Sequence, residues 1–274
     1  MRNIGVLIGC GPSTDVKAEF IKAQENGLQS CQLCIWNQDT YTDEKAAEIN
    51  AAVEETGFII STLWAGWSGP KEWNFSYGPS TLGLVPEAYR MTRLMELRNA
   101  ADFAVKIHVD KVATHVGFLP ENPDDPLFAG TVGALRNLCT YMEARGLYFL
   151  FETGQETPVT LRRVIEDVGT GNLGINLDPA NLILYGKGNP VDALDVFGEY
   201  VCDIHAKDGK YPTNGHDLGE ETIVGAGKVN FPKFVETLKS IGYNGTMIIE
   251  REIWGEQQIK DINDTKIYLE ELIG

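Results

Sequence analysis

Residues 147–179, LYFLFETGQETPVTLRRVIEDVGTGNLGINLDP, contain the pattern that decides the fold of this chain. An apolar run ends at Glu152, an amphipathic segment follows at 158–168, and a second apolar run ends at Asp178. Short apolar runs bounded by turn residues predict buried strands, and the helical spacing between them predicts a helix. A strand, a helix and another strand in this order predict parallel strands joined by a crossover helix.

The same alternation extends along the whole chain. Strands are expected at 3–8, 30–35, 58–64, 111–116, 147–152, 173–178, 201–206 and 246–250. Helices are expected at 15–27, 43–57, 86–106, 131–146, 158–168, 190–199, 231–242 and 258–272. Eight strand–helix units in 274 residues match a (β/α)8 barrel better than a doubly wound sheet. No linker or low-complexity segment divides the sequence, so we predict one TIM-barrel catalytic domain over residues 1–274.

Composition and charge restrict the partners of this protein. The formal net charge is −16 and the basic residues are scattered, so no nucleic-acid partner is expected, because an acidic surface repels phosphate. Neither a secretory signal nor an apolar run of about 18 residues is recognised, which predicts a cytoplasmic protein without a membrane partner. The five cysteines fit reduced thiols. Cys31 and Cys34 lie in one strand-like run that would point their sulfurs to opposite faces, which favours buried thiols over a zinc or redox pair.

Four ionisable side chains stand at the ends of consecutive strand-like runs: Glu152, Asp178, His205 and Glu250. Parallel strands of a barrel end at one rim, where barrel enzymes keep their chemistry. Carboxylates and a neutral imidazole together form an oxygen- and nitrogen-containing site for a divalent metal. Each residue alone could be a capping or solvated group, but four in successive strand ends favour a metal site.

Such a site suggests proton transfer next to a carbonyl. A metal bound by the carbonyl and hydroxyl oxygens of a sugar acidifies the carbon between them and stabilises the resulting enediolate. Two carboxylates could then remove and return protons on the two faces of the substrate. Glu152 and Glu250 are the expected catalytic pair, because their strands flank the other two. We therefore predict a divalent-metal-dependent isomerase or epimerase of a small sugar or sugar phosphate.

The four strand ends, together with HAKD at 205–208, VGAGKVNF at 224–231 and IGYNG at 241–245, resemble the xylose-isomerase-like TIM-barrel superfamily. Within it the chain is most similar to the sugar (phosphate) isomerase/epimerase branch, which includes ketose 3-epimerases and hydroxypyruvate isomerases. The resemblance covers essentially the whole chain. It implies one divalent ion per chain, with Mn²⁺ expected first and Mg²⁺, Co²⁺ or Zn²⁺ as alternatives. It also implies a carbohydrate substrate and a homodimer or homotetramer.

The resemblance further implies residues that bind the substrate. Glu156 is the nearest match to a second glutamate of the family, and His115 follows the fourth strand-like run, where the family often has a histidine facing the pocket. Trp64 and Trp67 could form an apolar wall against a sugar, although core packing is an equal alternative. Lys207 could hold a phosphate or hydroxyl group. The default interpretation of this lysine is an ordinary charged side chain in contact with solvent.

Asn181 marks a departure from the ketose 3-epimerases, which usually show Asp-x-x-His where this chain reads Asp178-Pro-Ala-Asn181. The amide of Asn181 can hydrogen-bond a substrate oxygen but cannot carry a proton charge. The motif at 225–228, Gly-Ala-Gly-Lys, is expected to be a turn rather than a phosphate cradle.

Three alternative functions remain open from the sequence. A metal-dependent lyase or dehydratase on a keto-polyol, similar to inosose dehydratases, would use the same proton abstraction. An endonuclease IV-like DNA-repair enzyme needs additional histidine ligands and a basic surface, which the net charge disfavours. A binding protein could also have kept the barrel without the activity.

Overall fold

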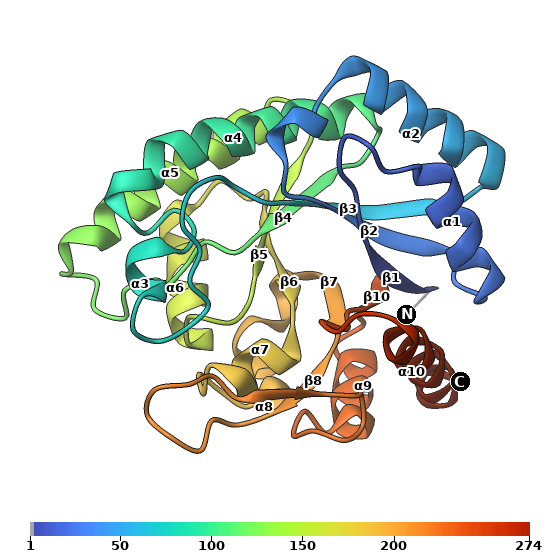
Figure 1. The fold of residues 1–274 in the computed structure, drawn as a ribbon. Coiled ribbons are helices and arrows are strands. Elements are labelled where there is room, and N and C mark those ends of the chain that lie inside the picture. Colours follow the sequence, from blue (N-terminus) through green and yellow to red (C-terminus); the bar gives the residue numbers. More distant parts are fainter. Residues whose placement is uncertain (1–2) are drawn as a thin grey trace.

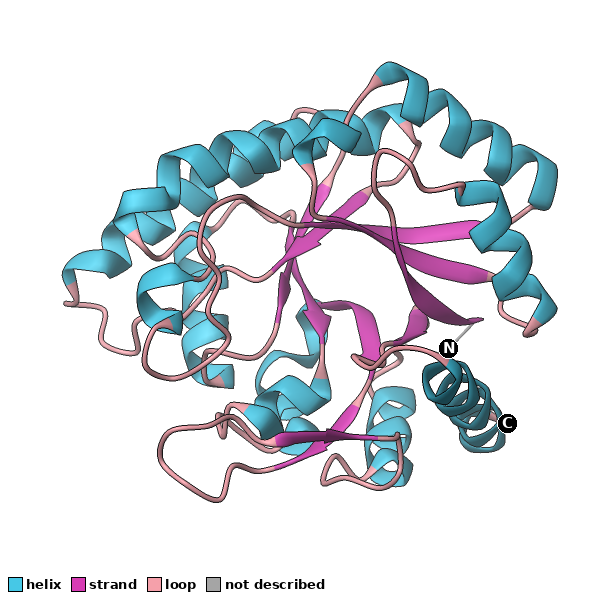
Figure 2. Ribbon diagram, in the orientation of Figure 1, coloured by secondary structure: helices cyan, strands magenta, loops and turns pink. Residues whose placement is uncertain are grey.

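The computed structural model describes residues 3–274, which form a closed barrel of eight parallel strands surrounded by helices (Figures 1 and 2). The strand order around the barrel is β1-β10-β7-β6-β5-β4-β3-β2. The barrel strands are β1 (Asn3–Gly9), β2 (Ser30–Ile35), β3 (Ile59–Ala65), β4 (Lys111–Thr114), β5 (Tyr148–Glu152), β6 (Leu173–Leu177), β7 (Val201–Ala206) and β10 (Thr246–Ile249). The predicted (β/α)8 barrel is confirmed.

The helices lie outside the barrel and connect successive strands (Figure 2). They are α1 (Val16–Glu25), η1 (Gln38–Thr40), α2 (Asp43–Thr56), α3 (Gly78–Thr81), α4 (Glu87–Lys106), α5 (Pro126–Glu143), α6 (Pro158–Val168), α7 (Pro179–Leu184), α8 (Pro190–Phe197), η2 (Gly198–Tyr200), α9 (Phe231–Ser240) and α10 (Glu256–Ile273). None of the helices within residues 3–274 combines the length and apolar character that crossing a membrane requires.

Helix α6 shows how the local sequence sets the boundaries of these elements. The Thr157 side chain accepts a hydrogen bond from the backbone N–H of Thr160, and Pro158 occupies the first turn, where a missing N–H is harmless. The helix stops at Gly169, whose φ of 66° lies in the left-handed region that suits a glycine C-cap.

Several short elements differ from the sequence expectation. The segment 207–230, for which the sequence predicts neither a strand nor a helix, contains the antiparallel strands β8 (Asp208–Lys210) and β9 (Glu220–Thr222) outside the barrel. Helices α3 and α7 were not predicted, and the fourth strand ends at Thr114 rather than at residue 116. Elements of three to six residues are too short for periodicity to identify.

The barrel closes where the chain begins and ends. Strand β1 pairs in parallel with both β10 and β2, and α10 contacts β1 and β10. The start of β1 and the end of α10 consequently lie near each other (Figure 1), and Asn3 and Gly274 line one shallow pocket. This closure brings the last barrel strand next to the first, so that Glu250 faces the same central space as residues from β5 and β6.

The barrel interior contains both a small apolar cluster and buried polar side chains. Trp64, Ala113 and Leu150 form a small buried cluster inside the barrel, separate from the large apolar layer between strands and helices. Asp203 is fully buried and accepts hydrogen bonds from Ser61 at 2.8 Å and from Thr62 at 2.7 Å. These bonds satisfy a charge that would otherwise be costly to bury, and they link β7 to β3 inside the barrel.

Arg93 on α4 fixes the long segment between β3 and α4 against the barrel rim. Its side chain is fully buried and lies 3.9 Å from the centre of the Trp67 ring. Its guanidinium donates hydrogen bonds to the backbone carbonyls of Ser68, Pro70, Thr81 and Gly83. Trp67 is therefore a core side chain under Arg93, which settles the choice between core and pocket wall for this residue.

Candidate metal centre

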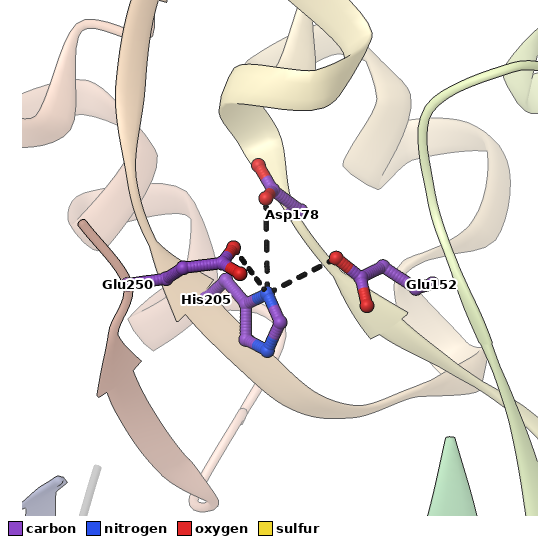
Figure 3. Close-up of side chains that lie close together, drawn as sticks. All are labelled: Glu152, Asp178, His205 and Glu250. Atoms are coloured by element: carbon purple, nitrogen blue, oxygen red, sulfur yellow. Dashed lines mark ion pairs between the residues drawn. The ribbon is translucent and has the colours of Figure 1, made fainter. Parts of the chain in front are cut away.

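Glu152, Asp178, His205 and Glu250 converge at one end of the barrel (Figure 3). They come from the carboxyl ends of the adjacent strands β5, β6, β7 and β10. One potential ligand atom from each lies within 4.8 Å of the others. The imidazole Nδ1 lies 3.1 Å from Glu250 Oε2, 3.3 Å from Glu152 Oε1 and 3.7 Å from Asp178 Oδ2. The structure therefore brings together all four side chains that the sequence selects as ligands.

Two atoms of this cluster are buried without a hydrogen-bond partner among the described residues: Asp178 Oδ2 and His205 Nδ1. The other carboxylate oxygen, Asp178 Oδ1, accepts from the Asn181 backbone N–H as the N-cap of α7. Unpaired buried polar atoms are uncommon, because each carries a desolvation cost. A divalent cation would satisfy both atoms at once, so the residues fit a single metal ion with oxygen and nitrogen ligands.

The far side of the His205 ring determines which nitrogen can bind a metal. Its Nε2 lies 2.8 Å from Gln32 Oε1, and Gln32 Nε2 donates to Asn176 Oδ1 at 2.8 Å. Nε2 also lies 3.1 Å from Asn176 Nδ2. With a metal ion at Nδ1, the proton of the neutral ring would be on Nε2, and the nearer partner, Gln32 Oε1, would accept it. The lone pair of a neutral imidazole is then on Nδ1, facing the carboxylates. The sequence analysis did not select Gln32. The signal that could have identified it is a polar side chain within an otherwise apolar strand.

Replacing Gln32 by leucine should weaken metal binding. Without the acceptor at Nε2, the orientation and tautomer of His205 are no longer fixed, and loss of such a support typically costs about 10–100-fold in metal affinity. Titration calorimetry with Mn²⁺ would measure the change. Thr62→Val, which alters the separate Asp203 network, serves as the matched interior control and should retain the affinity. A folded Gln32→Leu protein with unchanged Mn²⁺ affinity would contradict the assigned role.

Charge neighbours keep the two glutamates ionised. Burial by itself would raise the pKa of Glu152, but His115 and His205 outweigh it and hold this pKa well below its ordinary value. Burial likewise opposes ionisation of Glu250, and Lys207 and His205 lower its pKa to about 2. Both side chains are therefore anionic at neutral pH, as a metal ligand or a proton acceptor requires.

Lys207 is a buried countercharge of the cluster. Its Nζ lies 3.2 Å from both Glu250 Oε2 and Glu252 Oε1, and 3.6 Å from Asp178 Oδ2. Burial alone would lower its pKa, but these carboxylates raise the pKa well above the ordinary lysine value. Three ligand carboxylates and one ammonium leave two negative charges, which one divalent ion would balance.

A cavity of about 730 Å³ opens over this cluster. Glu152 and Glu250 line it, whereas Asp178 and His205 have no exposed surface. The two glutamates therefore form an acidic floor of the cavity, and the other two residues lie beneath it.

Three of the predicted substrate-binding residues line the cavity and contact Glu152. The indole N–H of Trp64 donates to Glu152 Oε2. The other carboxylate oxygen, Oε1, is 3.3 Å from His115 Nε2 and 3.5 Å from Asn181 Nδ2. All three side chains thus orient one carboxylate and are placed to touch a bound molecule.

The other two predicted substrate-binding residues, Glu156 and Lys207, are buried and do not belong to the cavity lining. Glu156 Oε1 accepts a long hydrogen bond of 3.4 Å from the backbone N–H of Gly154. Burial raises the pKa of Glu156 to about 7. Contact of these two side chains with substrate stays a prediction.

The glycine-rich turn at 225–228 encloses a carboxylate of the protein itself. Asp208 accepts hydrogen bonds from the backbone N–H groups of Gly225, Gly227 and Val229 at 3.0–3.1 Å. A Cβ atom at residue 227 would lie 2.1 Å from Asp208 Oδ1, so glycine is required there for space. Because Asp208 occupies these amides, they are not available to cradle a phosphate.

Three further tryptophans line the cavity and were not selected from the sequence: Trp36, Trp73 and Trp254. Trp36 directly follows β2, and Trp254 lies four residues after Glu250. A tryptophan soon after a strand end was the signal that could have identified these two. Trp73 lies within the long segment between β3 and α4, where only the tertiary structure shows its position.

Comparisons with known proteins agree with this architecture. The family model described as xylose isomerase-like TIM barrel matches residues 20–271. The crystal structure of a xylose isomerase domain protein from Planctomyces limnophilus is 33% identical, covers 99% of this chain and 97% of that chain, and superposes with a TM-score of 0.92. A D-tagatose 3-epimerase-like protein, 20% identical, covers 99% of this chain and 97% of that chain with a TM-score of 0.74, a likeness of fold.

An uncharacterized protein of Methanocaldococcus jannaschii is 28% identical over 190 residues, or 65% of this chain. The matched stretch spans 61% of the length of that protein. The family model covers nearly the whole chain, and the Planctomyces limnophilus structure shares the fold over 97% of its own length. This chain belongs to the xylose isomerase-like TIM barrel family.

Proposed function

We propose that this protein is a divalent-metal-dependent isomerase or epimerase of a small sugar. The observation that carries the proposal is that Glu152 and Glu250 line the cavity from the two flanks of a four-residue cluster, while Asp178 and His205 are buried beneath them. Two ionised carboxylates on either side of one site are what removal and return of a proton require. Family membership and the fold shared with a D-tagatose 3-epimerase-like protein support this reading.

The residues divide the reaction between them. Glu152, oriented by Trp64 and His115, takes the proton from the carbon next to the substrate carbonyl. Glu250 returns a proton from the other flank. When bound, a divalent ion at the four ligands supplies the positive charge that stabilises the developing oxyanion. The acidic cluster fits Mn²⁺ first, with Mg²⁺, Co²⁺ and Zn²⁺ as alternatives.

A metal-dependent lyase or dehydratase on a keto-polyol is the second candidate. Asn181 favours it, because this side chain lines the cavity at 3.5 Å from Glu152 Oε1 but cannot transfer a proton. The proton removal by Glu152 would be unchanged, and the steps would differ only after it. A carbohydrate substrate, a cytoplasmic location and a homodimer or homotetramer belong to the same proposal.

Solvent exchange tests the reaction independently of the product. The protein, stripped of metal and reloaded with Mn²⁺, would be incubated in D₂O with ketoses, their phosphates and inososes. We expect deuterium incorporation by proton NMR at the carbon next to the carbonyl of at least one compound, together with an isomer or epimer. Loss of water would favour the dehydratase. No exchange with any compound, from a protein that binds Mn²⁺, would count against both.

A further inference from the structure

The cavity is larger than a single sugar ring requires. A hexose has 12 heavy atoms, and at no more than about 30 Å³ for each water-sized group it needs at most about 360 Å³. The cavity measures about 730 Å³, so roughly half of it remains when one ring lies over Glu152 and Glu250. Volumes in this range suit ligands with more than one ring.

Aromatic side chains line the cavity from its floor to its mouth. Trp64, which contacts Glu152, is 5% exposed, and its ring centre is 5.0 Å from that of Trp36. Trp36 lies 6.5 Å from Trp73, which is 37% exposed, and Trp254 is 89% exposed. Trp254 is the most exposed large apolar side chain among the described residues, and a tryptophan ring in the lining of a cavity suits contact with a ligand.

The cavity offers no unpaired cation among the described residues. Arg251 is the one lysine or arginine in its lining, and its guanidinium is bound by Glu221 at 2.9 Å and by Asp261 at 2.8 Å. The imidazole of His115, also in the lining, lies 3.3 Å from Glu152 Oε1. The ammonium of Lys71 lies 4.9 Å from the centre of the Trp36 ring, outside the lining. Lys207 is held by three carboxylates behind the floor. The amides of the turn at 225–229 are filled by Asp208. A phosphate or carboxylate on the substrate would therefore meet acidic groups without a matching cation.

We propose, resting on the proposed function, that the substrate is an uncharged glycoside with at least two rings. The reacting keto-sugar ring lies over Glu152 and Glu250. The second ring, joined through the glycosidic bond, packs against Trp73 and Trp254 at the mouth. Aromatic side chains suit this role, because a sugar or aryl ring presents an apolar face of matching size.

Calorimetry on the Mn²⁺-loaded full chain tests this inference with four probes: D-glucose, phenyl β-D-glucoside, cellobiose and D-glucose 6-phosphate. We expect both two-ring glycosides to bind at least about tenfold more tightly than glucose, the factor that burial of one additional ring face provides. We expect glucose 6-phosphate to bind no better than glucose.

Substitutions at the mouth identify the second-ring contact. Trp73→Ala and Trp254→Ala should each reduce glycoside affinity by about tenfold and leave glucose affinity unchanged. Phenylalanine at either position should restore most of the loss. Tyr77→Ala is the matched control, because Tyr77 is 64% exposed and does not line the cavity.

Three results would overturn the inference. Equal or undetectable binding of glucose and the glycosides removes the second-ring site, and tighter binding of glucose 6-phosphate removes the requirement for a neutral substrate. If Trp254→Ala changes the sedimentation of the protein but not its glycoside preference, Trp254 is a subunit contact instead. None of these results affects the deuterium-exchange test. Conversely, a protein that prefers glycosides but exchanges no proton, either with the compounds of that test or with a keto-glycoside, would refute the proposed reaction alone.

Discussion

Replacing Glu152 or Glu250 by glutamine should reduce turnover by about 10²–10⁴-fold, the usual contribution of a positioned acid or base. Glutamine has nearly the same shape but can neither accept a proton nor carry the negative charge that binds a cation. Both residues line the cavity, and their lowered pKa values keep them anionic at neutral pH in the parent protein. The substitution to glutamine therefore removes a full negative charge from the cavity floor. Turnover would be measured with the compound identified by deuterium exchange.

Each substitution removes both a proton acceptor and a metal ligand, and the metal content of the variants separates these two effects. Elemental analysis of each variant shows how much of the lost turnover follows lost metal, and saturating Mn²⁺ should restore only that part. Glu236→Gln provides the control, because Glu236 is an exposed side chain on α9 that pairs with Lys233. Because the pair acts as a unit, the double variant should lose little more than either single one. Unchanged turnover in both single variants would refute the acid–base assignment.

Lys207→Met should lower the free energy of unfolding of the metal-free protein by about 3–5 kcal/mol, the cost of removing one partner from a buried ion pair. Methionine keeps the stem of the side chain but leaves Asp178 and Glu250 buried without their countercharge. Mn²⁺ should restore most of the loss, since the ion replaces the missing positive charge. Urea unfolding with and without Mn²⁺ measures both quantities.

The pH dependence of this loss follows from Glu250. Its pKa is lowered in the folded protein from 4.5 to about 2, so its contribution to stability is present above pH 4.5 and disappears as the pH falls toward 2. The difference between Lys207→Met and the parent should therefore shrink across this interval. Lys210→Met, at an exposed pair with Glu220, should change stability by no more than about 0.5 kcal/mol. If Lys207→Met is as stable as the parent at neutral pH, Lys207 is not the countercharge.

The alternation of strands and helices could be predicted because it depends on short-range patterns. Each barrel strand buries both faces, so it appears as a continuous apolar run, and each long helix shows one apolar stripe. Helix α7 escaped prediction because its six residues are all buried and show no stripe. Strands β8 and β9 escaped because three residues carry no measurable alternation.

The candidate metal centre could be predicted for a related reason. A residue at the carboxyl end of a parallel strand has its height in the barrel fixed by that position, so Glu152, Asp178, His205 and Glu250 had to approach one another once the strands were neighbours. Gln32 could not be selected in this way. It reaches His205 from β2, across the barrel interior, and no local pattern relates residues 173 positions apart.

The sequence by itself therefore determined the barrel, its rim and the chemical type of the four converging side chains, because these depend on apolar periodicity and strand-end position. Only the tertiary structure decided that Glu152 and Glu250 face the cavity, that Arg251 is already neutralised, and that Asp208 fills the glycine-rich turn. Those properties depend on contacts between segments far apart in the chain. Such contacts form when the barrel closes and side chains pack, and residue type alone does not encode which partner each charge finds.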